Sequence, residues 1–95
     1  MATVSITILD KRHKGHGVFT HYVEPSTPTL KEHIEEFIAW RKWCWETWGA
    51  GVERDFFRYS PDALWAWHSD NEVRNYRIYF KGAKELNWFK IRWMN

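Results

Sequence analysis

The segment from Thr27 to Trp48 most constrains what this chain folds into, because it is the one long stretch with the period of an amphipathic helix. The helix has two possible starting registers. In one, Pro28 is the first helical residue and Thr27 is its cap; in the other, Thr29 and Glu32 form a capping box. Gly49 predicts the end of the helix. The apolar residues fall within roughly a third of the helical wheel and are predicted to face a core; they are Leu30, Ile34, Phe37, Ile38, Cys44, Trp45 and Trp48.

Three residues of this helix do not fit a simple division into core and solvent sides. Arg41 projects from the middle of the apolar stripe. Either its stem packs while its guanidinium meets a carboxylate or a carbonyl, or it forms an anion site. Trp40 and Trp43 fall on the opposite side, where solvent is expected. Either a loop or the C-terminal segment covers them, or they form a partner surface, because tryptophan is enriched at interface hot spots.

The rest of the chain has mainly the two-residue alternation of β-strands. Strands are expected over 4–9, 18–23, 52–59, 64–68 and 73–80, with the first two paired as a hairpin. Residues 83–93 fit either a helical stripe or a strand, and we favour a helical turn over 83–88 followed by a terminal strand. The predicted fold is α+β: one domain over 1–95, with an antiparallel sheet of about five strands packed by one long helix in the order β-β-α-β-β-β.

Aromatic residues are unusually frequent: they make up 19% of the chain and include eight tryptophans. A core of this size cannot easily enclose eight indoles and give each N–H a partner, so several are expected to be partly exposed. This composition indicates binding more than catalysis.

Cysteine use and charge give weaker constraints. The single Cys44 excludes an internal disulfide framework, and no N-terminal apolar run has the pattern of a signal peptide or membrane span. A reducing, cytoplasmic location is therefore expected. The net charge of +2 is too small to indicate nucleic acid by itself, although both ends are basic and the helical middle is acidic.

No group of residues predicts a reaction. His13, His16 and His21, with Asp10 nearby, are the only cluster of metal-ligand types, and a hairpin tip without cysteine is a poor zinc cage. Cys44 lies on the apolar stripe and is expected to be a buried, inert thiol. No glycine-rich phosphate loop is present. We therefore predict a protein that is not an enzyme and has no metal or cofactor.

The C-terminal sequence offers one resemblance. Tyr79-Phe80-Lys81 is followed, after a short gap, by Glu85-Leu86-Asn87-Trp88-Phe89-Lys90-Ile91-Arg92-Trp93. This pattern resembles the ending of small early or accessory proteins of tailed bacteriophages. The resemblance implies a phage-encoded protein that acts in the host cytoplasm by binding and inhibiting a host protein, and it implies no catalytic residues.

Three functions remain open. The first is a non-enzymatic binder of a host protein, which inhibits or redirects that protein through an aromatic and basic surface made of Trp40, Arg41, Lys42, Trp43, Trp65, Trp67, Arg77 and Trp93. The second is a single-stranded nucleic-acid binder that stacks bases on a sheet face carrying Arg54, Arg58, Trp65, Trp67, Arg77 and Tyr79. The third is a virion or assembly component that self-associates. The sequence leaves the partner and the oligomeric state open.

Overall fold

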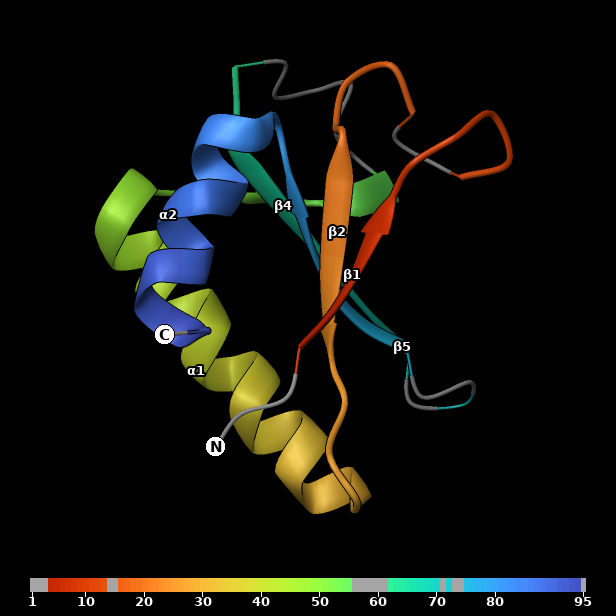
Figure 1. Ribbon diagram of the computed structural model, residues 1–95, viewed down its shortest axis with the longest axis vertical. Coiled ribbons are helices and arrows are strands. Elements are labelled where there is room, and N and C mark those ends of the chain that lie inside the picture. Colours follow the sequence, from red (N-terminus) through yellow and green to blue (C-terminus); the bar gives the residue numbers. More distant parts are fainter. Residues whose placement is uncertain (1–3, 14–15, 56–61, 71, 73–74, 95) are drawn as a thin grey trace.

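The chain forms a five-stranded sheet with two helices on one of its faces (Figure 1). The computed structural model describes residues 4–13, 16–55, 62–70, 72 and 75–94. In chain order the elements are β1 (Val4–Ile8), β2 (His21–Pro25), α1 (Leu30–Trp48), β3 (Val52–Glu53), β4 (Trp65–Asp70), β5 (Asn75–Phe80) and α2 (Ala83–Trp93). The predicted α+β class, with about five strands and one long helix, is confirmed.

The sheet is mixed, with the spatial order β1-β2-β5-β4-β3. β1 pairs with β2, β2 with β5 and β5 with β4, all antiparallel, so the expected N-terminal hairpin is present. β3 pairs with β4 in parallel through Val52 and Glu53 only. The strand predicted over 52–59 therefore ends at Glu53, and residues 56–59 lie outside the described part of the chain.

Local sequence signals define both ends of α1. The Thr29 hydroxyl accepts a hydrogen bond from the Glu32 backbone N–H at 3.2 Å, so the capping-box register is the one adopted. Gly49 ends the helix with a φ of 80°, a conformation that side chains other than glycine rarely adopt.

The side of α1 that faces the core differs from the prediction. Trp40 is fully buried, whereas Ile38 and Trp45 are 57% and 60% exposed. The buried positions are centred roughly 70° around the helix from the predicted stripe. The side that is buried faces α2, whose Phe89 packs edge-on against Trp40 with ring centroids 5.0 Å apart. The C-terminal segment thus covers the side expected to meet solvent.

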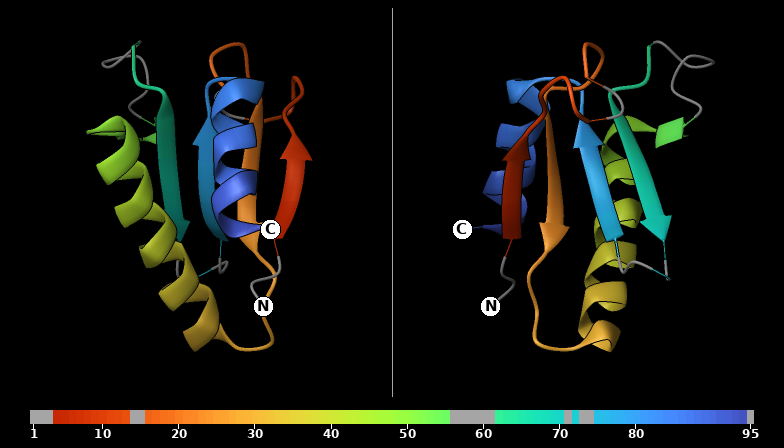
Figure 2. Two further views of the ribbon diagram at one scale, coloured as in Figure 1. Left: turned by 60° about the vertical axis from the view of Figure 1, so that its left-hand side comes forward. Right: turned by 90° about the vertical axis from the view of Figure 1, so that its right-hand side faces the viewer.

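α2 also corrects the prediction for the end of the chain. Residues 83–93 form one continuous helix, not a helical turn followed by a strand. Leu86 and Phe89 are buried and Trp93 is half-buried. These three residues form one helical stripe, which is the alternative to a strand that the sequence allowed for residues 83–93. Figure 2 shows α2 over the middle of the sheet and α1 beside β4.

The second face of the sheet has its own small core. Leu9 and Phe19, from the segment that joins β1 to β2, pack with Tyr22, Ala66 and Tyr79. β2 starts at His21 instead of Val18 because the preceding residues fold across this face. Side chains therefore cover both faces of the central strands. Among the described residues, no helix has the length and apolar character needed to cross a lipid bilayer.

Candidate functional site

A groove of about 300 Å³ lies between α1 and β4. We call it the α1–β4 groove; its lining residues are Ile38, Arg41, Lys42, Trp45, Gly51, Trp65 and Trp67. Ile38 and Trp45, both more than half exposed, form its apolar wall on α1. Exposed residues of this size are uncommon when clustered on a monomer and mark sites of interaction.

Arg41 is the central charged residue of the groove. Its guanidinium carbon lies 3.9 Å from the centre of the Trp67 ring and 5.7 Å from that of Phe37, so it makes cation–π contacts. All of the chain's Asp and Glu residues belong to the described part, and no ion pair joins any of them to Arg41. Partial burial lowers the pKa of Arg41 from its usual value, although the side chain remains charged.

The floor of the groove is held in place by Trp65. Its indole N–H donates to the Gly49 carbonyl at 3.0 Å and so ties β4 to the end of α1. A Cβ atom at Gly51 would stand 2.4 Å from Trp65 Cε2, so glycine is required where the chain passes this ring. The alternation of β4 then places Trp67 on the same face as Trp65, under Arg41.

The structure brings together four of the eight residues predicted to bind a partner protein: Arg41, Lys42, Trp65 and Trp67. Trp65 contributes only to the floor, since it is 2% exposed.

The other four predicted residues lie elsewhere. Trp40 is buried in the core and cannot contact a partner in the folded protein. Trp43 and Trp93 pack edge-to-face, 6.5 Å apart, where α1 meets α2. Arg77 lies 4.4 Å from the Tyr22 ring centre and 3.5 Å from a Glu24 oxygen. Tyr22 belongs to the small core on the opposite face of the sheet, so Arg77 is not part of the groove.

The predicted base-stacking face is not formed. Tyr79 is 1% exposed because Phe19 and Tyr22 pack against it, and Trp65 is buried under α1. The Arg54 guanidinium pairs with Asp55 at 3.0 Å. Arg58 lies outside the described residues. No exposed stacking surface forms because the helices cover one face of the sheet, and Leu9, Val18 and Phe19 cover the other.

Ile38 and Trp45 were assigned to the core from the sequence, yet they form the exposed wall of the groove. A signal was present in the spacing: Ile38, Arg41, Lys42 and Trp45 follow an i, i+3, i+4, i+7 pattern, which puts them on one side of a helix. The central arginine distinguishes this stripe from an ordinary core stripe.

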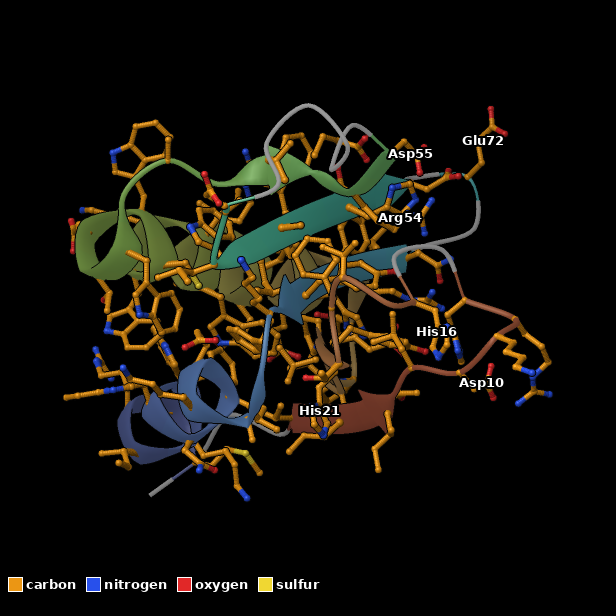
Figure 3. The ribbon with its side chains drawn as sticks, turned by 90° about the horizontal axis from the view of Figure 1, so that it is seen from above. Asp10, His16, His21, Arg54, Asp55 and Glu72 are labelled. Atoms are coloured by element: carbon orange, nitrogen blue, oxygen red, sulfur yellow. The ribbon has the colours of Figure 1, made fainter. Side chains whose placement is uncertain are left out.

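The histidines near the N-terminal turn do not converge. His13 Nδ1 accepts the Asp10 backbone N–H at 3.1 Å, and His21 lies on β2. Figure 3 shows the side chain of His21 apart from those of Asp10 and His16. Within the described residues they form no three-ligand group.

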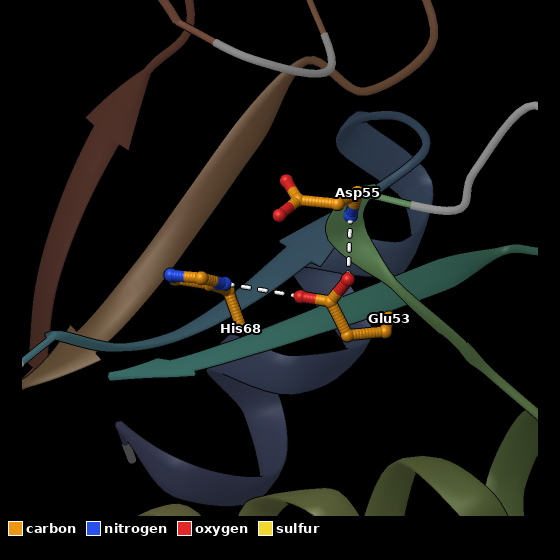
Figure 4. Close-up of side chains that lie close together, drawn as sticks. All are labelled: Glu53, Asp55 and His68. Atoms are coloured by element: carbon orange, nitrogen blue, oxygen red, sulfur yellow. Dashed lines mark hydrogen bonds and ion pairs between the residues drawn. The ribbon is translucent and has the colours of Figure 1, made fainter. Parts of the chain in front are cut away.

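A different set of possible metal ligands occurs where β3 leaves the sheet (Figure 4): Glu53, Asp55 and His68 place donor atoms within 4.8 Å of one another. The Glu53 carboxylate already accepts from the Asp55 N–H at 2.8 Å and meets His68 Nδ1 at 3.0 Å. Asp55 also pairs with the Arg54 guanidinium, whose charge competes with any cation. The contacts present therefore account for all three side chains without a metal.

Cys44 is fully buried on α1, and this burial raises the pKa of its thiol far above the usual value. The expectation of a buried thiol is confirmed. A thiol that stays protonated is a poor nucleophile, so Cys44 contributes packing.

Comparison of the chain with protein families, with curated proteins and with solved structures finds no match in any of the three.

Proposed function

We propose that this chain is a small non-enzymatic binding protein that engages another protein through the α1–β4 groove. One observation carries the proposal. Arg41 is stacked on Trp67 with no carboxylate partner among the described residues, and Ile38 and Trp45 lie exposed beside it.

The residue types support a protein interface. Tryptophan and arginine dominate interface hot spots because they combine a large contact area with a polar group that fixes orientation. Ile38 and Trp45 expose apolar area that a partner would remove from water, at roughly 25 cal/mol for each Å². The partly buried Trp67 and Arg41 are already held against each other, so little ordering is needed on binding.

The C-terminal resemblance to small phage proteins supports a bacterial host protein as the partner, with inhibition or redirection as the consequence of binding. In the fold, Leu86 and Phe89 of that motif are buried. The C-terminal motif therefore supports a phage origin of the chain, whereas the α1–β4 groove supplies the proposed contacts with the partner.

Affinity capture with matched variants tests the proposal. Wild-type protein, the double variant Ile38→Ser/Trp45→Ser and the control Trp88→Ser would be immobilised and exposed to a bacterial lysate. Trp88 is 54% exposed on α2 and lies outside the groove, so it matches Trp45 in type and exposure. We expect a protein that wild type and Trp88→Ser retain and the double variant loses. Equal retention by all three would contradict the proposal.

Self-association through the same groove is the second candidate, and the exposure of Ile38 and Trp45 favours it equally. Light scattering over a range of concentrations separates the two. A mass that rises with concentration for wild type, and not for Ile38→Ser/Trp45→Ser, would make a second copy of the chain the occupant.

A further inference from the structure

We propose that the α1–β4 groove recognises a protein segment in which an acidic residue stands beside a large apolar residue. The carboxylate would pair with Arg41 and Lys42, and the apolar side chain would pack against Ile38 and Trp45. This inference rests on the proposed function and specifies the chemistry of the partner.

The case for an acidic residue begins with the state of Arg41. Its guanidinium is partly removed from water, and its contacts in the described structure are to aromatic rings. A cation in such a position is stabilised by an anion, and a charge-assisted bond to a carboxylate is among the stronger polar contacts available. Since the described carboxylates of the chain form no ion pair with Arg41, a ligand is left to provide one.

The charge around Arg41 favours the same ligand. Lys42 lines the groove next to it, and the lining includes no acidic residue. Unpaired positive charge at an interface attracts negatively charged partners and disfavours basic ones.

The apolar wall of the groove is the reason for the large apolar residue in the proposed partner segment. Ile38 and Trp45 are exposed by 57% and 60%, and a carboxylate alone would leave both in water. The volume of about 300 Å³ is at the lower end of the range for ligand pockets, so it suits one or two side chains of a peptide.

The same geometry argues against nucleic acid as the occupant. Stacking needs a free aromatic face, and Arg41 covers one face of Trp67 at 3.9 Å. A phosphate backbone also needs several cations along a track, whereas the groove has two.

A displayed library of random dodecapeptides tests the proposal. Selection would use wild-type protein, Arg41→Gln, Trp45→Ser and the control Arg92→Gln. Arg92 makes a similar cation–π contact, 4.3 Å from the Trp93 ring centre, but lies outside the groove. Each selected peptide would then be compared with its counterpart carrying Asn or Gln for each acidic residue, and with single-stranded oligo-dT.

We expect wild type and Arg92→Gln to select peptides that place Asp or Glu beside an aromatic or large aliphatic residue. Arg41→Gln, or the amide counterpart of the peptide, should weaken binding about fivefold to tenfold. Apolar peptides without acidic enrichment, lost with Trp45→Ser, would overturn the acidic motif and leave the proposed function standing. Absence of any peptide sensitive to Trp45→Ser would overturn both. Oligo-dT binding that depends on Trp45 and exceeds that of every peptide would replace a protein partner with nucleic acid.

Discussion

Replacing Trp40 and Trp45 separately with alanine distinguishes the observed orientation of α1 from the one that the sequence predicts. Trp40 is fully buried against Phe89, and its N–H donates to Glu36 at 3.2 Å. A buried tryptophan removes roughly 150 to 250 Å² from water, and Trp→Ala in a core typically costs about 3 to 5 kcal/mol. Trp45 is 60% exposed, so its replacement should change the free energy of unfolding by about 0.5 kcal/mol or less.

Urea unfolding followed by far-UV circular dichroism measures both effects. A domain of 95 residues has a total stability of about 5 to 14 kcal/mol, so a loss of about 4 kcal/mol should leave Trp40→Ala mostly folded in water. A loss of about 4 kcal/mol lowers the urea midpoint by more than about 1 M. It also lowers Tm by at least about 15 °C for a domain of this size. Equal losses for the two variants, or a larger loss for Trp45→Ala, would refute the placement of α1.

Three further predictions follow from single contacts. Gly51→Ala should lower the thermal midpoint markedly, because the added Cβ would stand 2.4 Å from Trp65 Cε2, and Ala50→Gly in the same loop is the control measured in the same melt. Thr29→Ala should destabilise the protein by about 1 kcal/mol in urea unfolding, because it removes the cap on the Glu32 N–H, whereas Thr29→Ser should retain most of the stability. Cys44 should react with iodoacetamide at neutral pH only in molecules that have unfolded, because the native thiol is fully buried and burial also raises its pKa; rapid labelling of native protein in a mass measurement would contradict its position.

The predictions that succeeded rest on short-range patterns. The start and end of α1 follow from Thr29, Glu32 and Gly49, whose capping chemistry acts within one helical turn. The alternation over 73–80 predicted a strand, and β5 occupies Asn75–Phe80 with Tyr76, Ile78 and Phe80 in the core on one face of the sheet, because side chains of a strand alternate whatever the strand pairs with.

The predictions that failed depend on contacts between distant segments. Whether Tyr79 is exposed depends on Phe19, which lies 60 positions earlier in the chain and folds over it. No alternation within β5 contains that information. The parallel pairing of β3 with β4 likewise depends on how the fold brings the two strands together and not on the composition of either strand.

The rotation of α1 and the open groove have one physical cause. The apolar stripe predicted from the wheel is centred on Arg41, so turning that stripe toward the sheet would bury a charge, which costs several kcal/mol without a paired carboxylate. With the helix rotated toward α2, Trp40 fills the core and the Arg41 guanidinium reaches the margin, where the Trp67 ring supports it. The same rotation leaves Ile38 and Trp45 in water. A partner that covers these two residues and brings a carboxylate to Arg41 would remove their apolar area from water and give the guanidinium an ion pair, which is why we propose the exposed stripe as a binding surface.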